Sequence, residues 1–419
     1  MAASRFLGRL ERIEPARTAP DGGRDLAELR AKMAEILGRP REAAEELRVQ
    51  SSAPRELPLA PYETEEGVAR RKLRRVSGGE HVGSIPLSGA GSAFMELLAL
   101  LALSPELAEL DPTRLLYFDT ETTGLFGAGV VPFVCGLAWF DAEKTLHFEQ
   151  IFLPSPGDEP VLLRRLGELF EECDGIVSFN GRTFDEPLLR SRGVMNRMPR
   201  LPERPHLDLL HVARRLHKAR IGRTRLVDLE SEVLGFLRGD DVSGAEIAPR
   251  YAHFLRTGDA SAIEPILTHN EWDVLSMVAL VGLYGDPVDL LHPADLAEGA
   301  RVLSRAREFE TGISWAEIAR EKGASVPANR ALACLHRARG DRARALVAYE
   351  ELAQEIQDPR VRLELVKLYE HHEKDFRRAL EILELGTGEP PERLSARRAR
   401  LERKAQCPPK ARKRKGSPA

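Results

Sequence analysis

The segment 115–124, with the sequence LLYFDTETTG, constrains the fold of this chain more than any other. Its four apolar and aromatic residues in a row are typical of a buried β-strand. Asp119 and Glu121 follow, and because residues i and i+2 of a strand point to the same side, the two carboxylates project together from its end. Such close carboxylates repel each other unless a cation lies between them, and Mg²⁺ prefers oxygen ligands. The segment therefore predicts either a metal site or a polar, solvated turn.

The composition is typical of a soluble globular protein with two or three domains. Of the 419 residues, 42% are apolar and 30% are charged. The four cysteines are scattered without a CxxC pair, so neither a zinc site nor a disulfide framework is expected, and free thiols fit a cytoplasmic protein. The N-terminus lacks the apolar core of a signal peptide and no apolar run reaches about 18 residues, so we expect no membrane partner.

From residue 114 the pattern becomes α/β. Three antiparallel strands are predicted first, the central one followed by strands at 133–140 and 145–153. Strand and helix then alternate, and a long helix at 261–283 ends the unit. This order predicts a mixed sheet flanked by helices.

Residues 1–92 are expected to be partly disordered or peripheral to that unit. Helical periodicity at 25–48 is broken near 38–40, and 51–61 is rich in proline. A basic cluster follows, and it is interpreted either as a solvated face or as a nucleic-acid-binding arm. The cluster consists of Arg70, Arg71, Lys72, Arg74 and Arg75.

Residues 294–390 lose all strand character and contain a repeat. Ala345 and Leu346 recur 34 residues later as Ala379 and Leu380. This is the tetratricopeptide period, in which pairs of helices stack on their neighbours, and a generic helical bundle is the alternative. The tail at 391–419 is strongly basic and is predicted to be disordered, either attracted to polyanions or solubilising the chain.

Two further acids occur in distinctive contexts. Asp185 follows a predicted strand in IVSFNGRTFD, where Asn180 lies on the turn. Asp273 lies in THNEWDVLSM inside the last helix, four residues after His269, and such a pair shares one helical face. Taken alone, each of these is more often a surface or core feature than a catalytic one.

Taken together, the motifs resemble a known family. DTETTG, NGRTFD and HNEWD occur in this order within about 155 residues and resemble the DEDD exonuclease arrangement on an RNase H-like fold. More closely, FNGRTFDEPLLRSR, HLDLLHVARRL, DLESEVLG and HNEWDVLSM are similar to the YprB-type RNase H-like domain, which is often joined to tetratricopeptide repeats. The resemblance implies an RNase H-like exonuclease domain at 93–288, with the helical repeats at 294–390.

The resemblance also implies a nuclease site with two Mg²⁺ or Mn²⁺ ions. Asp119 would bridge both ions, Glu121 and Asp273 would hold one, and Asp185 would bind the second. His269 would orient or deprotonate the attacking water. It departs from the family pattern, which has tyrosine four residues before the last aspartate or histidine five before it.

The expected substrate-binding residues lie in the motifs and in a basic stretch at 204–225, which could instead be a solvated helical face. They are Thr122, Thr123, Gly124, Asn180, Arg214 and Arg215. His206 and Asp208 also recur in the resembling pattern and are interpreted as support for the fold, with Asp208 capping the helix that follows.

These inferences favour a metal-dependent 3′–5′ exonuclease that hydrolyses phosphodiester bonds at single-stranded ends of DNA or RNA. The helical repeats would recruit a protein partner or orient the strand. The alternatives are a non-catalytic adaptor that binds nucleic acid and a structure-specific endonuclease with the same residues.

Overall fold

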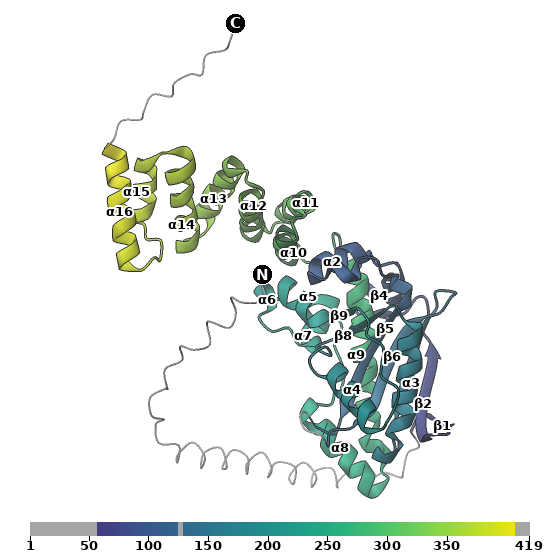
Figure 1. The fold of residues 1–419 in the computed structure, drawn as a ribbon. Helices are drawn as coiled ribbons and strands as arrows, with labels where there is room; N and C mark the ends of the chain where they lie inside the picture. Colours follow the sequence, from purple (N-terminus) through teal and green to yellow (C-terminus); the bar gives the residue numbers. More distant parts are fainter. Residues whose placement is uncertain (1–56, 125–128, 407–419) are drawn as a thin grey trace, which may run out of the picture.

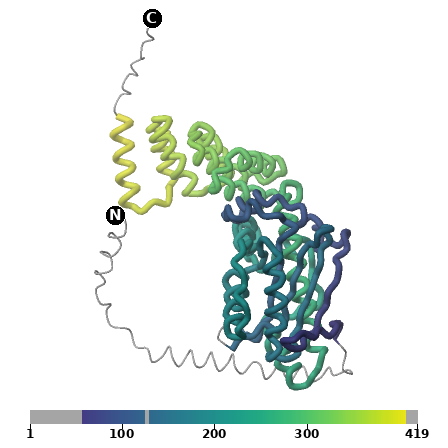
Figure 2. The backbone as a smooth tube through the Cα atoms, turned by 45° about the vertical axis from the view of Figure 1, so that its right-hand side comes forward, coloured from purple at the N-terminus to yellow at the C-terminus, as the bar shows by residue number. Residues whose placement is uncertain are grey.

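The computed structural model describes residues 57–124 and 129–406 of the chain (Figure 1). A mixed β-sheet with helices on both faces is followed by an all-helical array. In Figures 1 and 2 this array, from α10 (Pro293–Ala306) to α16 (Pro391–Gln406), extends away from one end of the sheet region. The predicted α/β fold, an RNase H-like mixed sheet followed by a helical region, is confirmed.

The sheet has seven strands in the order β1-β2-β7-β6-β5-β8-β9. The first five strands in this order, β1, β2, β7, β6 and β5, pair antiparallel with their neighbours. β5 then pairs parallel with β8, and β8 pairs parallel with β9. The central strand β5 therefore joins an antiparallel half to a parallel half. The strands are β1 Ala60–Thr64, β2 Gly67–Arg75, β5 Leu115–Thr122, β6 Pro132–Phe140, β7 Leu146–Phe152, β8 Gly175–Ser178 and β9 His206–Asp208, and β3 His81–Val82 with β4 Ile85–Pro86 forms a separate hairpin.

Residues 1–92 were expected to be partly disordered or peripheral, and of these residues β1 and β2 form one edge of the sheet. The basic cluster lies on β2, where Lys72 Nζ and Arg74 Nε donate to the Glu271 carboxylate at 2.6 and 3.0 Å. Long cationic side chains hide a strand pattern because their stems can cover apolar surface while the charges find partners. Residues 1–56, including the predicted helix at 25–48, lie outside the described residues.

The alternation of side chains along β5 divides the core into two layers. Leu116 and Phe118 pack in the core that contains α3 and α8, whereas Leu115 and Tyr117 pack in the core that contains α2, α5 and α9. The side chains at 119 and 121 continue the second set, toward α9. The flanking helices include α2 Met95–Ala102, α3 Glu159–Glu172, α4 Asp185–Met195, α5 Leu209–Leu216, α7 Leu226–Leu229, α8 Gly244–Thr257 and α9 Glu264–Gly285.

The long helix α9 crosses the sheet over β5 and β6. Two glycines in its second half let it approach residues 87–93. A Cβ at Gly285 would lie 2.5 Å from Ala93 Cβ, and one at Gly282 would lie 3.1 Å from the Ala90 nitrogen. The predicted helix at 261–283 therefore exists, although Asp259 caps a short turn at Ala260–Ala262 rather than α9 itself. Close packing of α9 fixes the height of its side chains above β5.

The C-terminal array consists of antiparallel helices whose core is continuous with the α9 side of the sheet. Its last helix corrects the prediction of a disordered tail from residue 391. α16 packs on the Glu370 carboxylate, which is fully buried and accepts hydrogen bonds from Arg400 and Lys404, each at 2.7 Å. Residues 407–419 lie outside the described residues. The helices are α10 Pro293–Ala306, α11 Phe309–Glu321, α12 Ser325–Arg339, α13 Arg342–Glu355, α14 Pro359–Leu368, α15 Phe376–Glu384 and α16 Pro391–Gln406.

Among all the described helices, none combines the length and the apolar character needed to span a bilayer.

Candidate active site

Four carboxylates predicted from separate motifs line one cavity of about 510 Å³ at the end of β5. β5 and β8 run parallel, so their carboxyl ends meet at the same edge of the sheet. Asp119 and Glu121 come from β5, Asp185 begins α4 just after β8, and Asp273 comes from α9 above them. Thr122, Gly124 and His269 also line this cavity. The structure thus brings together all five residues predicted to be catalytic.

A buried amide network orients Asp119. Asn270 Nδ2 donates to Asp119 Oδ2 at 2.9 Å, and Gln150 Nε2 donates to Asn270 Oδ1 at 2.8 Å. Asn270 is fully buried, so these bonds hold it in one orientation. Gly136 lies between Asp119 and Gln150 in the sheet, and a Cβ there would lie 2.3 Å from Asn270 Oδ1. The network therefore requires glycine at position 136.

Asp185 is held at the start of α4 by Thr120 of β5, and His206 of β9 supports the adjoining residue of α4. Thr120 Oγ1 donates a short hydrogen bond to Asp185 Oδ1. Next to it, His206 contacts Ser178 Oγ through Nε2 at 2.7 Å and Glu186 Oε2 through Nδ1 at 2.8 Å. His206 therefore ties β8 to the first turn of α4.

Glu121, His269 and Asp273 approach one another as metal ligands do. Each offers an atom that lies within 4.8 Å of the others. His269 Nε2 is 3.9 Å from Glu121 Oε1 and 3.6 Å from Asp273 Oδ2. The one-turn spacing on α9 places His269 and Asp273 on the face that covers the end of β5.

Arg238, a site residue not predicted from the sequence, contacts this group from the segment between residues 234 and 244. Its side chain is only 4% exposed, and it is bonded through Nε at 2.5 Å and Nη2 at 2.6 Å to the fully buried Glu230 carboxylate. Nη2 also donates to Asp273 Oδ1. Because guanidinium cannot lose its proton in proteins, Arg238 is a permanent positive charge beside Asp273.

His269 Nδ1 has two competing neighbours. It lies 2.7 Å from Asp241 Oδ1 and 3.0 Å from Arg238 Nη1. A protonated Nδ1 can donate only to Asp241, and this tautomer leaves the Nε2 lone pair facing Glu121 and Asp273. Asp241 is therefore in position to set the tautomer in which His269 accepts a proton or binds a metal.

Ionisation of the carboxylates in the cavity is unfavourable without a cation. Burial, followed by the charges of Asp273 and Glu121, raises the pKa of Asp119 well above its usual range. Burial and the charge of Asp273 likewise raise the pKa of Glu121, although Arg238 opposes this. Burial also raises the pKa of Asp185, against the hydrogen bond from Thr120. Four carboxylates and one imidazole form a donor set that suits Mg²⁺ or Mn²⁺, and such an ion would relieve the repulsion. The residues present therefore fit a divalent metal.

Some predicted binding residues lie elsewhere. Thr123 is engaged with the backbone of Val131, which donates to its hydroxyl at 3.0 Å. Arg215 donates to the Leu101 carbonyl at 3.2 Å, so it joins α5 to α2 instead of facing the carboxylates. Asn180 and Arg214 line a separate pocket. Asp208 caps α5 as predicted, accepting from the Leu210 nitrogen at 3.1 Å.

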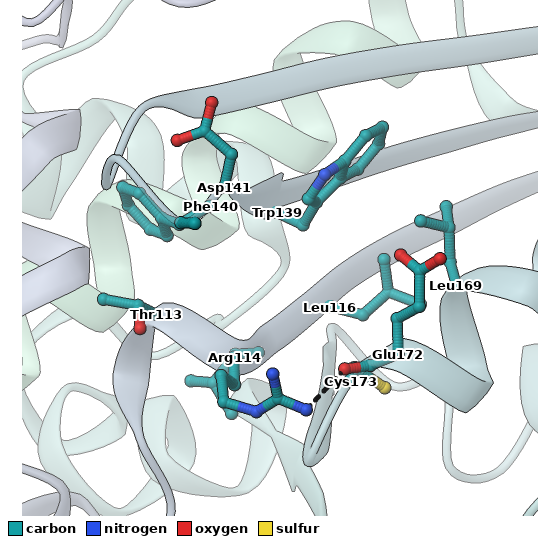
Figure 3. A pocket seen from close by; sticks show the side chains of 11 residues that line it. Thr113, Arg114, Leu116, Trp139, Phe140, Asp141, Leu169, Glu172 and Cys173 are labelled. Carbon is teal, nitrogen blue, oxygen red and sulfur yellow. Dashed lines mark hydrogen bonds between the residues drawn. The ribbon is translucent and has the colours of Figure 1, made fainter.

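A further cavity of about 450 Å³ lies at the start of β5, at the opposite end of the strand from Glu121 (Figure 3). Arg114 on its wall donates to the Glu172 carbonyl at 2.8 Å and pairs with Asp174 at 2.5 Å. Asp141 pairs with His147 at 2.7 Å, but within the described residues neither of the two lining acids, Asp141 and Glu172, belongs to a cluster of three or more metal-ligating side chains. The carboxylate cavity is therefore the better candidate for chemistry.

Comparisons with known proteins agree with this geometry. Residues 116–284 match the RNase H superfamily. YprB of Bacillus subtilis (strain 168) is 33% identical over 313 residues, which cover 70% of this chain and 75% of that protein. A family B DNA polymerase from the archaeon Pyrobaculum calidifontis aligns with 57% of this chain and 29% of its own, at 15% identity and a TM-score of 0.33, a likeness too weak to support any inference. The identity and coverage shared with YprB show that this chain belongs to the YprB family, with an RNase H superfamily domain at residues 116–284.

Proposed function

We propose that the chain is a metal-dependent nuclease, acting as a 3′–5′ exonuclease on single-stranded ends of DNA or RNA. The observation that carries this proposal is the convergence of Asp119, Glu121, Asp185 and Asp273 on one cavity. These acids come from three segments separated by about 60 to 90 residues, and folding brings them together despite their repulsion. A purely structural site has no need of such a group, whereas metal-assisted phosphodiester hydrolysis requires it.

Asp119, Glu121, Asp185 and Asp273 would hold two divalent ions. Bound there, the ions supply stabilisation of the attacking and leaving oxygens during in-line displacement at phosphorus. The chain itself positions these ligands through Asn270 on Asp119, Thr120 on Asp185 and Arg238 on Asp273. Because Arg238 occupies one oxygen of Asp273, the other remains for a metal.

The rest of the cavity wall fits a nucleotide. An apolar part of the wall includes Phe184, Leu188 and Ile247, in contrast to the charged carboxylates. Apolar and aromatic side chains accept a nucleobase of any sequence because every base has a flat, polarizable face. Thr122 and Gly124 complete the wall beside Glu121, where backbone and hydroxyl groups can approach the sugar.

His269 is the proposed base for the attacking water. In the tautomer favoured by Asp241, its Nε2 lone pair faces the carboxylates where the water would lie. A neutral imidazole with a free Nε2 lone pair can act as a general base.

The test is cleavage of end-labelled single strands of DNA and RNA with Mg²⁺ or Mn²⁺. The Asp119→Asn and Asp273→Asn variants should lose at least about 100-fold in rate, since the ligands act together. Glu143→Gln, an exposed acid on a turn far from the cavity, is the matched control and should cleave at the wild-type rate. A chelator should abolish cleavage by every form.

The pattern of products distinguishes the alternatives. Release of mononucleotides from the 3′ end supports the exonuclease, whereas internal fragments from structured substrates indicate an endonuclease. Tight binding without product under either metal would identify a non-catalytic adaptor. Full activity of purified Asp119→Asn protein would reject the assignment of the site.

A further inference from the structure

A second pocket, of about 630 Å³, lies near the carboxylate cavity and has a contrasting charge. We call it the arginine pocket. None of the residues that line it is acidic. They are Phe179, Asn180, Leu210, Arg214, Arg223, Thr224, Arg225 and Leu226.

The arginine pocket faces the same sheet edge as the carboxylates. Phe179 and Asn180 follow β8, and the α5 residues follow β9, whose carboxyl end lies beside that of β8. The loop from Phe179 to Phe184 joins the two sites, because its first residues line the arginine pocket and Phe184 lines the carboxylate cavity. Asp185 is five positions after Asn180, so their Cα atoms lie at most about 18 Å apart.

This loop holds the two sites at a fixed separation. The Gly181 nitrogen donates to Ser178 Oγ at 3.1 Å, and the Asn180 nitrogen donates to Asp208 Oδ1 at 2.8 Å. Asn180 has φ = +70°, a left-handed conformation that asparagine tolerates better than most residues. A Cβ at Gly181 would lie 2.6 Å from Ser178 Oγ, so glycine is required there.

The basic stretch divides into cations that support the fold and cations that remain available. Arg204, Arg215 and Arg220 bond to the chain itself, Arg204 and Arg215 to carbonyls and Arg220 to the Asp295 carboxylate. By contrast, the side chains of Arg214, Arg223 and Asn180 have no hydrogen-bonding partner within 57–124 and 129–406, and both arginines are exposed. Arg225 pairs with Asp228 at 2.6 Å. Of the exposed cations in this stretch without such a partner, Arg214 and Arg223 line the arginine pocket, whereas Lys218 does not.

We infer that the arginine pocket binds backbone phosphates of the nucleic-acid strand whose end lies in the carboxylate cavity. This inference rests on the proposed nuclease function and adds a remote anchor to it. Guanidinium groups match the geometry of phosphate oxygens, and the Asn180 amide and Thr224 hydroxyl add donors. Contacts to backbone phosphates do not depend on the nucleotide sequence, and a nuclease that moves along a strand requires such contacts.

The anchor makes binding depend on the length of the strand. A strand that fills the carboxylate cavity but ends before the arginine pocket loses the phosphate contacts of Arg214 and Arg223. Binding should therefore strengthen stepwise as oligothymidines are lengthened across about 4 to 16 nucleotides, the usual range of single-strand sites.

The experiment measures the anisotropy of labelled oligothymidine with full-length protein carrying Asp119→Asn, so that binding is read without cleavage. Adding Arg214→Ala and Arg223→Ala should weaken binding of long strands by about tenfold or more, as expected for hydrogen bonds to charged groups. The slope of log K against log salt should fall by about 1 to 2. Short strands should be affected little.

The matched control removes two exposed arginines from the helical array, Arg342→Ala and Arg393→Ala, at the same cost in net charge. This control variant should keep both the increase in affinity with strand length and the slope of log K against log salt. An equal loss in both double variants would show that only net charge matters and would overturn the inference.

The remaining outcomes separate this inference from the proposed function. If wild-type protein cleaves but Arg214→Ala with Arg223→Ala changes neither affinity nor slope, the anchor is wrong and the nuclease stands. If wild-type protein never cleaves but binding depends on these arginines, the nuclease is wrong and the phosphate contacts stand. Displacement of the strand by polyglutamate as effectively as by oligothymidine would assign the pocket to acidic peptides instead.

Discussion

Asp119 is a residue at which burial and neighbouring charge both oppose ionisation. Its raised pKa means that the folded state retains a proton that the unfolded state releases. Stability without metal is therefore greatest where both states are protonated, and it falls as pH rises through the folded pKa. We expect Asp119→Asn to raise the melting temperature in chelator at pH 8 by about 2–4 °C, the shift that 1 kcal/mol produces in a domain of roughly 200 residues.

Thermal unfolding across pH checks this prediction. The rise in melting temperature caused by Asp119→Asn should shrink toward pH 4, near the pKa of an unfolded aspartate. Glu143→Gln is the control and should shift little at any pH. Addition of Mg²⁺ or Mn²⁺ should reverse the order, because the wild type gains a bound ion and the variant loses a ligand. A variant less stable than the wild type in chelator at pH 8 would contradict the proposed repulsion.

At this scale, the sequence was sufficient for the residues that carry charge within recognisable motifs. Strand and helix periodicity paired Asp119 with Glu121 and His269 with Asp273. The resemblance to the DEDD and YprB-type motifs implied that these residues and Asp185 form one site. Asn270 was visible in HNEWD, but its role depends on Gln150 and Gly136, which no local pattern connects to it. Arg238 and Asp241 lie in a segment without periodicity, so only the folded chain reveals their contacts.

Among the elements, the pair of β6 and α9 decides whether the site forms. α9 packs directly on β6 at Gly136, where a Cβ would lie 2.3 Å from Asn270 Oδ1 and 2.8 Å from Val274 Cγ2. Gly136→Ala should push α9 away and separate Asn270 from Asp119. We expect a loss of about 1–3 kcal/mol in the free energy of unfolding, typical of overpacking, together with weaker metal binding.

Urea unfolding and titration with Mn²⁺ measure the two effects. Gly193→Ala in α4 is the matched control, because nothing lies within 4 Å of a Cβ there. A helical Gly→Ala change normally stabilises by about 0.5–1 kcal/mol, so the control should move in the opposite direction. Unchanged stability and metal affinity in Gly136→Ala would show that the packing of α9 on β6 does not determine the geometry of the site.

Elements with a regular apolar pattern were predictable, and those with a mixed pattern were not. β6 is apolar on both faces, and β7 has apolar residues at both of its ends, so the two could be recognised as buried strands. β2 reads GVARRKLRR, and its charges conceal a sheet position that exists only because β7 offers an edge. α16 was missed for a similar reason, since its arginines are neutralised by Glu370, far away in the sequence.

In the whole molecule, the sheet region and the helical array share one core and a polar joint. His217 on the sheet side contacts Asp295 Oδ2 on α10 through Nδ1 at 2.9 Å and Tyr284 Oη through Nε2 at 3.0 Å. Arg220 adds a bond of 2.6 Å to the same carboxylate. The 34-residue repeat predicted stacked helices, and a tetratricopeptide identity and a protein partner for the array stay predictions. The joint could not be predicted, because its members are 67 to 78 residues apart.

Asp295 therefore links the stability of the joint to pH. Burial works against its ionisation, but the hydrogen bonds from His217 and Arg220 hold its pKa below the usual value. The stabilisation is present above the unfolded pKa and lost as pH falls through the folded one. At pH 7, Asp295→Ala removes the carboxylate partner of a buried histidine and of an arginine, at a cost of about 3–5 kcal/mol. Calorimetry should show one transition for the wild type and two for the variant, because the array would unfold separately.

Asp289→Ala removes an exposed acid just before α10 and should retain the single transition. A single, unshifted transition in Asp295→Ala would mean that the apolar core alone couples the two regions.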